Sequence, residues 1–182
     1  MSPEVSQPTE AIDAAFQAAV RALSRAAAPA DPGAPLRNGA RLDGGRALAL
    51  FDSQLQSRHL DLAARYLRAR GTGFYTIGGC GHEGNAALAA ALRVSDPALL
   101  HYRSGGFYAE RARQYLDSGQ IGIDPLRDVL LGVVASAEDP IAGGRHKVFG
   151  SPQLQIVPQT STIGSHLPRA VGMALAIERA RK

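Results

Sequence analysis

The sequence contains very little cysteine, and this limits the kinds of site it can build. Cys80 is the only cysteine in the chain. A single thiol excludes an internal disulfide framework and a multi-cysteine zinc site. Such a chain suits a reducing compartment, and we expect Cys80 to be a small packing residue.

Long apolar runs are also missing. The longest, residues 129–135, falls far short of the roughly 20 residues that cross a bilayer. A secretory signal begins with basic residues and an apolar core. The N-terminal region of this chain instead carries the acidic residues Glu4, Glu10 and Asp13 and has no such core. We therefore expect a cytoplasmic protein with no membrane partner.

Lysine is scarce, occurring only at Lys147 and Lys182. The formal net charge of +4 comes from scattered arginines, without the basic runs and interleaved aromatic residues of a nucleic-acid surface. We expect no nucleic-acid partner. The hydrophobic fraction of 45% and the charged fraction of 20% are those of an ordinary globular domain.

Proline divides the chain into an arm and a main domain. Residues 11–28 favour a helix, which the proline- and alanine-rich residues 29–35 must end, because proline lacks an amide donor and restricts its predecessor. We predict that residues 1–40 are an N-terminal helical arm and linker, and that residues 41–182 form one domain.

The main domain should be mostly helical. Apolar residues recur at helical spacing over residues 45–70, and a second such helix follows Gly106 and ends at Gly119. A short strand is predicted at residues 154–157, followed by an alanine-rich C-terminal helix. The segment between residues 71 and 85 is too rich in glycine for regular structure and is predicted to be a shaped loop.

Three positions carry the signals of helix starts. Asn85 is a suitable cap for a short alanine-rich helix that reaches Arg93. Ser95-Asp96-Pro97 and Asp124-Pro125 each place a capping side chain directly before a proline, which the first turn of a helix tolerates. We expect a helix after each of the three.

Four polar clusters lie in the predicted loops: residues 81–84, 101–103, 144–147 and 160–166. Arg103, Arg145 and Lys147 can pair with phosphate or carboxylate oxygens, and Tyr102 adds a hydroxyl donor. We therefore expect an anionic ligand. Four of the five histidines also lie in these loops, where they are candidate acid–base groups.

The sequence supports a zinc site or a serine-hydrolase site less well than an anion site. His82-Glu83 lacks the second histidine of the metalloprotease helix, which disfavours a zinc site, and no Gly-x-Ser-x-Gly elbow indicates a serine hydrolase. Loop histidines and glycines are also common in plain turns. Residue chemistry alone thus leads to an anion-binding domain that is α/β or mostly helical.

Over about residues 45–180, the order of the clusters resembles the alpha subunit of the decarboxylating component of 2-oxo acid dehydrogenases, of the branched-chain type. Gly81-His-Glu-Gly resembles the family's Gly-Gln-Glu or Gly-Glu-Glu loop, Tyr102-Arg103 its Tyr-Arg segment, and Gly144-Arg145 the start of its Gly-Arg loop. Residues 161–174 resemble its Ser-Pro-Leu segment and Pro-x-Ala-x-Gly-x-Ala helix.

The resemblance implies an α/β fold that binds thiamine diphosphate. Residues 41–182 would be the N-terminal portion of an alpha-type domain, mostly helical with few short strands. By the same resemblance, Tyr102 and Arg103 would contact the diphosphate of the cofactor, and the backbone around Ser161 and Ile163 would meet its aminopyrimidine ring.

The resemblance also assigns catalytic positions. Glu83 would lie near the substrate, and His146 and Arg145 would stabilise its charged groups. His82 stands where the family has glutamine or glutamate, so its role is open. The family places a histidine directly before an aromatic residue and a glycine, where this chain has Val148, so the role of His146 requires a remodelled loop.

The implied function is the oxidative decarboxylation of a 2-oxo acid with transfer of the acyl group to a lipoyl group, an enzymatic reaction that depends on thiamine diphosphate. The implied partners are a beta-type domain or subunit and a lipoyl acyltransferase core, in a homo- or hetero-oligomer. Two alternatives stay open. One is another thiamine-diphosphate enzyme, acetoin-cleaving or transketolase-like, and the other is a non-catalytic anion-binding or regulatory module of the same ancestry.

Magnesium would complete the implied cofactor site. The family holds this ion with a Gly-Asp-Gly segment and a later asparagine, which the resemblance places beyond Lys182. No residue of this chain is therefore assigned as a metal ligand. We expect these residues alone to be inactive and to bind the cofactor weakly or not at all.

Overall fold

The computed structural model describes residues 8–23, 31–74 and 78–182. It divides into two compact units, Met1–Gly44 and Gly45–Lys182. About half of the chain is helical, and the strands that the described part contains form one two-stranded sheet. The expectation of an α/β chain that is mostly helical with few short strands is confirmed at this level.

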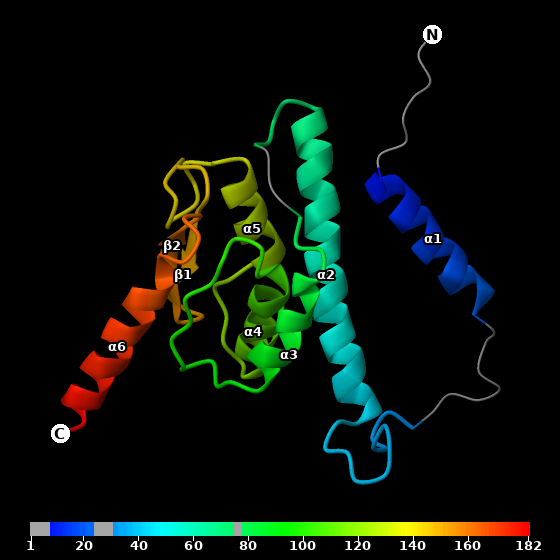
Figure 1. The fold of residues 1–182 in the computed structure, drawn as a ribbon, viewed down its shortest axis with the longest axis horizontal. Helices are drawn as coiled ribbons and strands as arrows, with labels where there is room; N and C mark the ends of the chain where they lie inside the picture. Colours follow the sequence, from blue (N-terminus) through cyan, green and yellow to red (C-terminus); the bar gives the residue numbers. More distant parts are fainter. Residues whose placement is uncertain (1–7, 24–30, 75–77) are drawn as a thin grey trace. The chain divides into compact units, whose positions relative to one another are not determined.

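The first unit contains α1 (Pro8–Ala22), drawn in blue in Figure 1. This helix falls within the arm predicted at residues 1–40, but the end of the predicted helix, residues 24–28, lies outside the described residues. Further along, an antiparallel bridge joins Pro35 to Asp43 and closes a turn.

The second unit begins with α2 (Gly44–Ala69), which confirms the predicted helix over residues 45–70. The buried residues of this helix are Ser53, Ser57, Leu60 and Ala64. Small side chains on this face allow α4 (Gly105–Asp117) to approach closely. A methyl group added at Gly105 would lie 2.7 Å from the Oγ atom of Ser57, so this crossing of the two helices requires a glycine.

Between these two helices the chain forms the short turn η1 (His82–Gly84) and α3 (Asn85–Ala90), which packs against α4 (Figure 1). Gly84, not Asn85, occupies the cap position of α3, and no side chain caps the helix, so the predicted cap was wrong. Cys80 is exposed, which also contradicts the packing role predicted for it.

The second predicted helix start was wrong. The Asp96 carboxylate accepts hydrogen bonds from the backbone amide of Arg93 at 3.0 Å and from its guanidinium at 2.7 Å. These bonds close a turn backwards along the chain, so the carboxylate does not cap a following helix. After Pro97 the chain is extended, and Ala98 forms a parallel bridge with Ile156.

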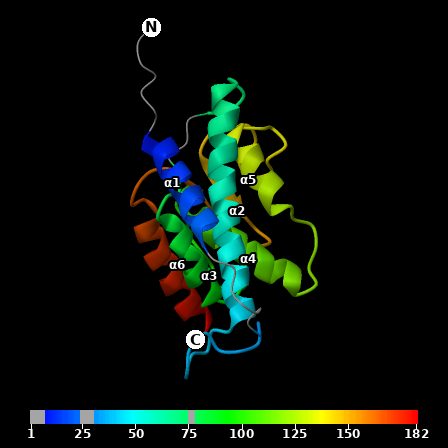
Figure 2. The ribbon, with the colours of Figure 1, turned by 90° about the vertical axis from the view of Figure 1, so that its right-hand side faces the viewer.

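The third predicted start is confirmed by α5 (Pro125–Val133). The Asp124 side chain accepts a hydrogen bond from the backbone amide of Arg127 at 3.0 Å, and proline occupies the first turn. Gly119, with φ of 81°, lies just past the end of α4 as predicted. In both views α5 lies beside α2 (Figure 1, Figure 2).

The sheet consists of β1 (Val148–Ser151) and β2 (Ile156–Thr160), which are antiparallel. The sequence indicated only one strand, at residues 154–157, so the prediction missed β1 and began the second strand too early. Leu154 lies in the turn between the strands and is completely buried. The register shifts between Phe149 and Ser151, and this irregularity weakens the alternating pattern that would reveal a strand.

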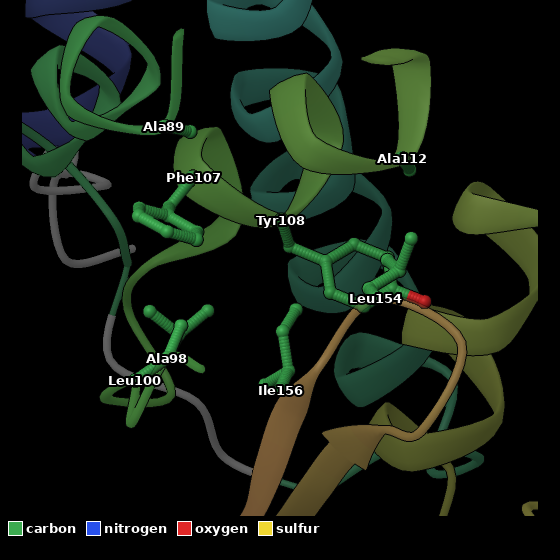
Figure 3. Packing of buried hydrophobic residues seen from close by; sticks show 8 residues of the cluster. All are labelled: Ala89, Ala98, Leu100, Phe107, Tyr108, Ala112, Leu154 and Ile156. Atoms are coloured by element: carbon green, nitrogen blue, oxygen red, sulfur yellow. The ribbon is translucent and has the colours of Figure 1, made fainter. Parts of the chain in front are cut away.

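The main core forms where α4 meets this hairpin. Figure 3 shows Leu154 and Ile156 from the hairpin next to Tyr108 of α4. The buried cluster consists of Ala89, Ala98, Leu100, Phe107, Tyr108, Ala112, Leu154 and Ile156. The segment 98–100 is thereby held between a helix and a strand, and it leads directly into the candidate site.

Two charged side chains of α4, Glu110 and Arg111, are completely buried, and neither was predicted from the sequence. Arg111 donates through Nη1 to the backbone carbonyls of Asp96 at 2.9 Å and Leu154 at 3.2 Å, and to a third carbonyl at Val94. The neighbouring Glu110 accepts hydrogen bonds from Arg46 at 2.7 Å, from Arg113 and from Ser53. Arg111 thus ties a turn and the hairpin to α4, while Glu110 ties α2 to α4.

The chain ends in α6 (His166–Ala180), which confirms the predicted alanine-rich helix. None of its residues is buried. Across the part of the chain that the structure describes, no helix combines the length and the apolar character needed to cross a membrane.

Candidate functional site

A tight turn at residues 101–104 brings basic and aromatic side chains together. The Ser104 amide donates to the His101 carbonyl at 2.8 Å, and the Arg103 amide donates to the Nδ1 atom of the His101 ring at 3.3 Å. Helix α4 starts directly after this turn. Its N-terminal end adds positive potential at the place where the basic side chains gather.

Tyr102 is at the centre of this group. Its ring centroid lies 3.9 Å from that of His101, 5.8 Å from the guanidinium carbon of Arg103 and 5.3 Å from the Nζ atom of Lys147. Both cations are within the range of a cation–π interaction. Lys147 belongs to the third polar cluster of the sequence, so the second and third clusters meet at one aromatic ring.

The loop that carries Lys147 has an unusual backbone. Gly143 and Gly144 have positive φ angles of 52° and 84°, and Lys147 itself has φ of 58°. A left-handed conformation costs free energy at a residue other than glycine, and such strain is typical of functional loops. Next to it, the ring of His146 lies 4.7 Å from that of Phe74, with an angle of 39° between the planes.

His101, Tyr102, Arg103, His146 and Lys147 line a cavity of about 230 Å³. The turn at 101–104 and the loop at 146–148 supply its basic and aromatic wall. Apolar residues of α2, α5 and β1 also line it; they include Leu60, Ala64, Val129, Val133 and Phe149. The cavity lining therefore combines basic, aromatic and apolar side chains.

The basic side chains around the cavity affect the pKa of His101. Burial lowers the pKa of His101, and the positive charges of Arg103, His82, His166 and Lys147 lower it further. Members of all four polar clusters thus influence one imidazole ring. Like charges repel, so a bound anion would stabilise this arrangement.

Two hydrogen-bond donors on this side are buried and have no hydrogen-bond partner among the residues that the structure describes. They are Nε2 of His101 and Nε of Arg103. Because Nδ1 of His101 accepts the Arg103 amide, the neutral ring carries its proton on Nε2. Buried donors without partners are costly, and they indicate where acceptor oxygens of a ligand would fit.

Carboxyl groups also line the cavity. The Tyr108 hydroxyl lies 3.4 Å from Oδ2 of Asp128 and donates towards it. Burial raises the pKa of both the Tyr108 phenol and the Asp128 carboxyl. Asp61 of α2 also lines the cavity, and burial raises its pKa as well. The sequence did not single out any of these three residues.

The residues assigned from the sequence fall into two groups. Tyr102, Arg103 and His146 line the cavity. Arg145 and Glu83 do not. Arg145 donates instead to the backbone carbonyls of residues 141 and 142, at 3.0 and 2.8 Å, within its own turn.

The positions assigned to the aminopyrimidine also lie outside the cavity lining. Ile163 is 80% exposed, and Ser161 is partly buried. The influence of His166 on the pKa of His101 nevertheless brings the end of this loop near the cationic side. The catalytic and aminopyrimidine assignments remain predictions.

The donors of the cavity suit a diphosphate. Guanidinium, ammonium, phenol and imidazole N–H groups are the usual protein partners of phosphate oxygens. No group of three or more His, Cys, Asp or Glu side chains that could hold a metal ion occurs within residues 8–23, 31–74 and 78–182. Comparisons of this chain with protein-family models, with curated proteins and with solved structures find no match.

Proposed function

We propose that this chain belongs to a thiamine-diphosphate-dependent 2-oxo acid dehydrogenase and that its cavity holds the diphosphate of the cofactor. One observation carries the proposal: Arg103, Lys147 and the N–H donor of His101 converge around Tyr102 on one side of a cavity. The sequence resemblance assigned the diphosphate to Tyr102 and Arg103, and the geometry adds two donors from other positions.

In this proposal each side chain has a defined task. Arg103 and Lys147 neutralise the diphosphate charge, and Tyr102 and Nε2 of His101 donate hydrogen bonds to its oxygens. The apolar side chains of the lining would limit the water around a bound diphosphate and so strengthen these electrostatic contacts. Bound thiamine diphosphate would supply the carbon centre on which a 2-oxo acid loses carbon dioxide, before transfer of the acyl group to a lipoyl group.

The rest of the assembly follows from the same proposal. A beta-type domain or subunit and a lipoyl acyltransferase core would be its partners, within an oligomer that works in the cytoplasm. The positions assigned to Glu83 and Arg145 would then serve the substrate rather than the diphosphate.

A non-catalytic anion-binding module is the second candidate. It is favoured by the position of Arg145, whose side chain is bound to carbonyls of its own turn instead of lining the cavity. A module of this kind needs only the cationic side of the cavity. It would bind small phosphates without regard to the thiamine part.

Calorimetry with three ligands separates these candidates. Thiamine diphosphate with magnesium, inorganic pyrophosphate and thiamine are each titrated into the protein. The dehydrogenase proposal predicts that thiamine diphosphate binds more tightly than pyrophosphate, with a dissociation constant on the order of 1 mM, and that thiamine alone does not bind measurably. Equal affinities for the two diphosphates would favour the anion-binding module. No binding of either would contradict both.

A further inference from the structure

Asp61 of α2 reaches the glycine-rich loop that follows this helix. Its Oδ2 atom accepts a hydrogen bond from the Gly79 amide at 2.6 Å. A methyl group added at Gly78 would lie 3.3 Å from this oxygen, and one at Gly79 would lie 3.4 Å from it. The two adjacent glycines therefore pack closely against the carboxylate, and a side chain at either position would contact it directly.

The same contact leads directly to the candidate site. The Gly79 carbonyl accepts a hydrogen bond from the His82 amide at 2.6 Å, which begins the turn η1. A methyl group at Gly79 would also lie 3.4 Å from the carbonyl oxygen of Arg103, so the loop touches the turn that carries the proposed diphosphate ligands. The start of the loop is thus fixed on one side by α2 and on the other by residues 101–104.

At the far end of the loop, the backbone of Glu83 packs against α4. A methyl group at Gly106 of α4 would lie only 2.8 Å from the carbonyl oxygen of Glu83. Backbone therefore lies directly against backbone at this point. His82 and Glu83, which the sequence singled out, stand between the two attachments, and the Asp61 side chain of α2 binds the loop at Gly79.

The surroundings of Asp61 act on its charge in opposite directions. Burial raises its pKa, while the hydrogen bond from Gly79 opposes this effect. The negative charge of Glu83 raises the pKa further, and the positive charges of Arg58 and Arg65 lower it. These two arginines lie on the same helix, three residues before and four residues after Asp61, and therefore on the same face.

We propose that Asp61 is a positioning residue, which holds residues 78–84 against the turn at 101–104 and so places His82 and Glu83 beside the candidate anion site. The loop placement itself does not depend on the proposed function. Only the use of His82 and Glu83 by a substrate or cofactor rests on that function.

Amide hydrogen exchange measured by NMR tests the hydrogen bond directly. In the Asp61→Ala variant the Gly79 and His82 amides should exchange about tenfold faster or more, because a hydrogen bond to a charged acceptor is worth about 1.5–3 kcal/mol. Asp52→Ala is the matched control, since Asp52 lies exposed on the same helix and accepts only from Gln56 at 2.8 Å. Unchanged exchange at Gly79 in Asp61→Ala would contradict the proposal.

The pKa of His101 separates positioning from a general loss of stability. His82→Gln should raise this pKa in the wild-type protein, because it removes a positive neighbour. In the Asp61→Ala background the same substitution should have no effect, since the loop no longer holds His82 near His101. An equal rise in both backgrounds would show that the loop stays in place without Asp61 and would overturn the proposal.

If Asp61→Ala does not fold, amide exchange is measured in Asp61→Asn instead. Its carboxamide oxygen still accepts the Gly79 amide, but a bond to a neutral acceptor is roughly half as strong. Exchange at Gly79 should therefore rise by a smaller factor, and no rise would count against the proposal. None of these measurements requires a ligand, so a failure of thiamine diphosphate to bind would remove the proposed function and leave the role of Asp61 intact.

Discussion

Replacing Arg111 by methionine removes the hydrogen bonds that connect α4 to a turn and to the hairpin. Nη1 of Arg111 is 2.9 to 3.2 Å from three backbone carbonyls, and it has two hydrogens to share among them. Two hydrogen bonds from a charged donor are worth about 3–6 kcal/mol. Methionine recovers part of this free energy, because it fills the same volume and carries no charge that must be buried. The cost of burying the Arg111 charge is reflected in its pKa, which burial lowers. We expect a net loss of about 2–4 kcal/mol.

Urea denaturation measures this loss as a shift of the midpoint at constant slope. The matched control is Arg127→Met, because Arg127 is exposed and forms an ion pair with Glu138 on the surface. This pair should contribute less than about 1 kcal/mol. A loss for Arg111→Met no larger than that of the control would refute the structural role given to the buried guanidinium.

Three further predictions concern helix packing, pH dependence and the anion site. Gly105→Ala should destabilise the protein by about 1–3 kcal/mol, because the new methyl group would lie 2.7 Å from a side-chain oxygen of α2. Gly172→Ala, which has open space around it, should stabilise α6 by about 0.5–1 kcal/mol. Denaturation midpoints that shift in the same direction for both variants would contradict this explanation. Burial raises the pKa of Asp128 in the folded state, so its contribution favours folding below the usual value of 3.8 and is lost as the pH rises through the folded pKa. Asp128→Asn should therefore flatten the change in stability as the pH rises above about 4, and an unaltered profile would speak against the burial effect. NMR titration should show that inorganic pyrophosphate raises the pKa of His101, because a bound anion offsets the cations around it, and a pKa insensitive to pyrophosphate would place the anion elsewhere.

Two Asp-Pro pairs show how far local signals predict the fold. Asp124 caps α5 as expected, through the amide of Arg127. Asp96 has the same sequence signal, but Arg93, three residues before it, offers a guanidinium and a backbone amide that bind its carboxylate first. The propensity was the same in both cases, and a competing partner on the N-terminal side decided the outcome.

The sequence indicated some of the residues that line the candidate cavity, but not their arrangement. Residue chemistry indicated Tyr102, Arg103 and Lys147 as anion ligands. These three side chains come together through the bridge between Ala98 and Ile156 and through the irregular hairpin. Such contacts join distant parts of the chain and produce no periodic pattern in the sequence. Asp61, Glu110 and Arg111 were missed for a different reason, since a charged residue on a helix reads as exposed unless its partner is known.

The diphosphate site is tested most directly by the affinity of inorganic pyrophosphate for the wild-type protein, for Arg103→Ala and for the surface control Arg127→Ala. Loss of a charge-assisted hydrogen bond worth about 1.5–3 kcal/mol should weaken binding to Arg103→Ala at least about tenfold. The control should remain within about a factor of two of the wild type, because Arg127 lies on the surface, paired with Glu138, and does not line the cavity. Equal affinities for all three proteins would contradict the assignment of the diphosphate to Tyr102 and Arg103.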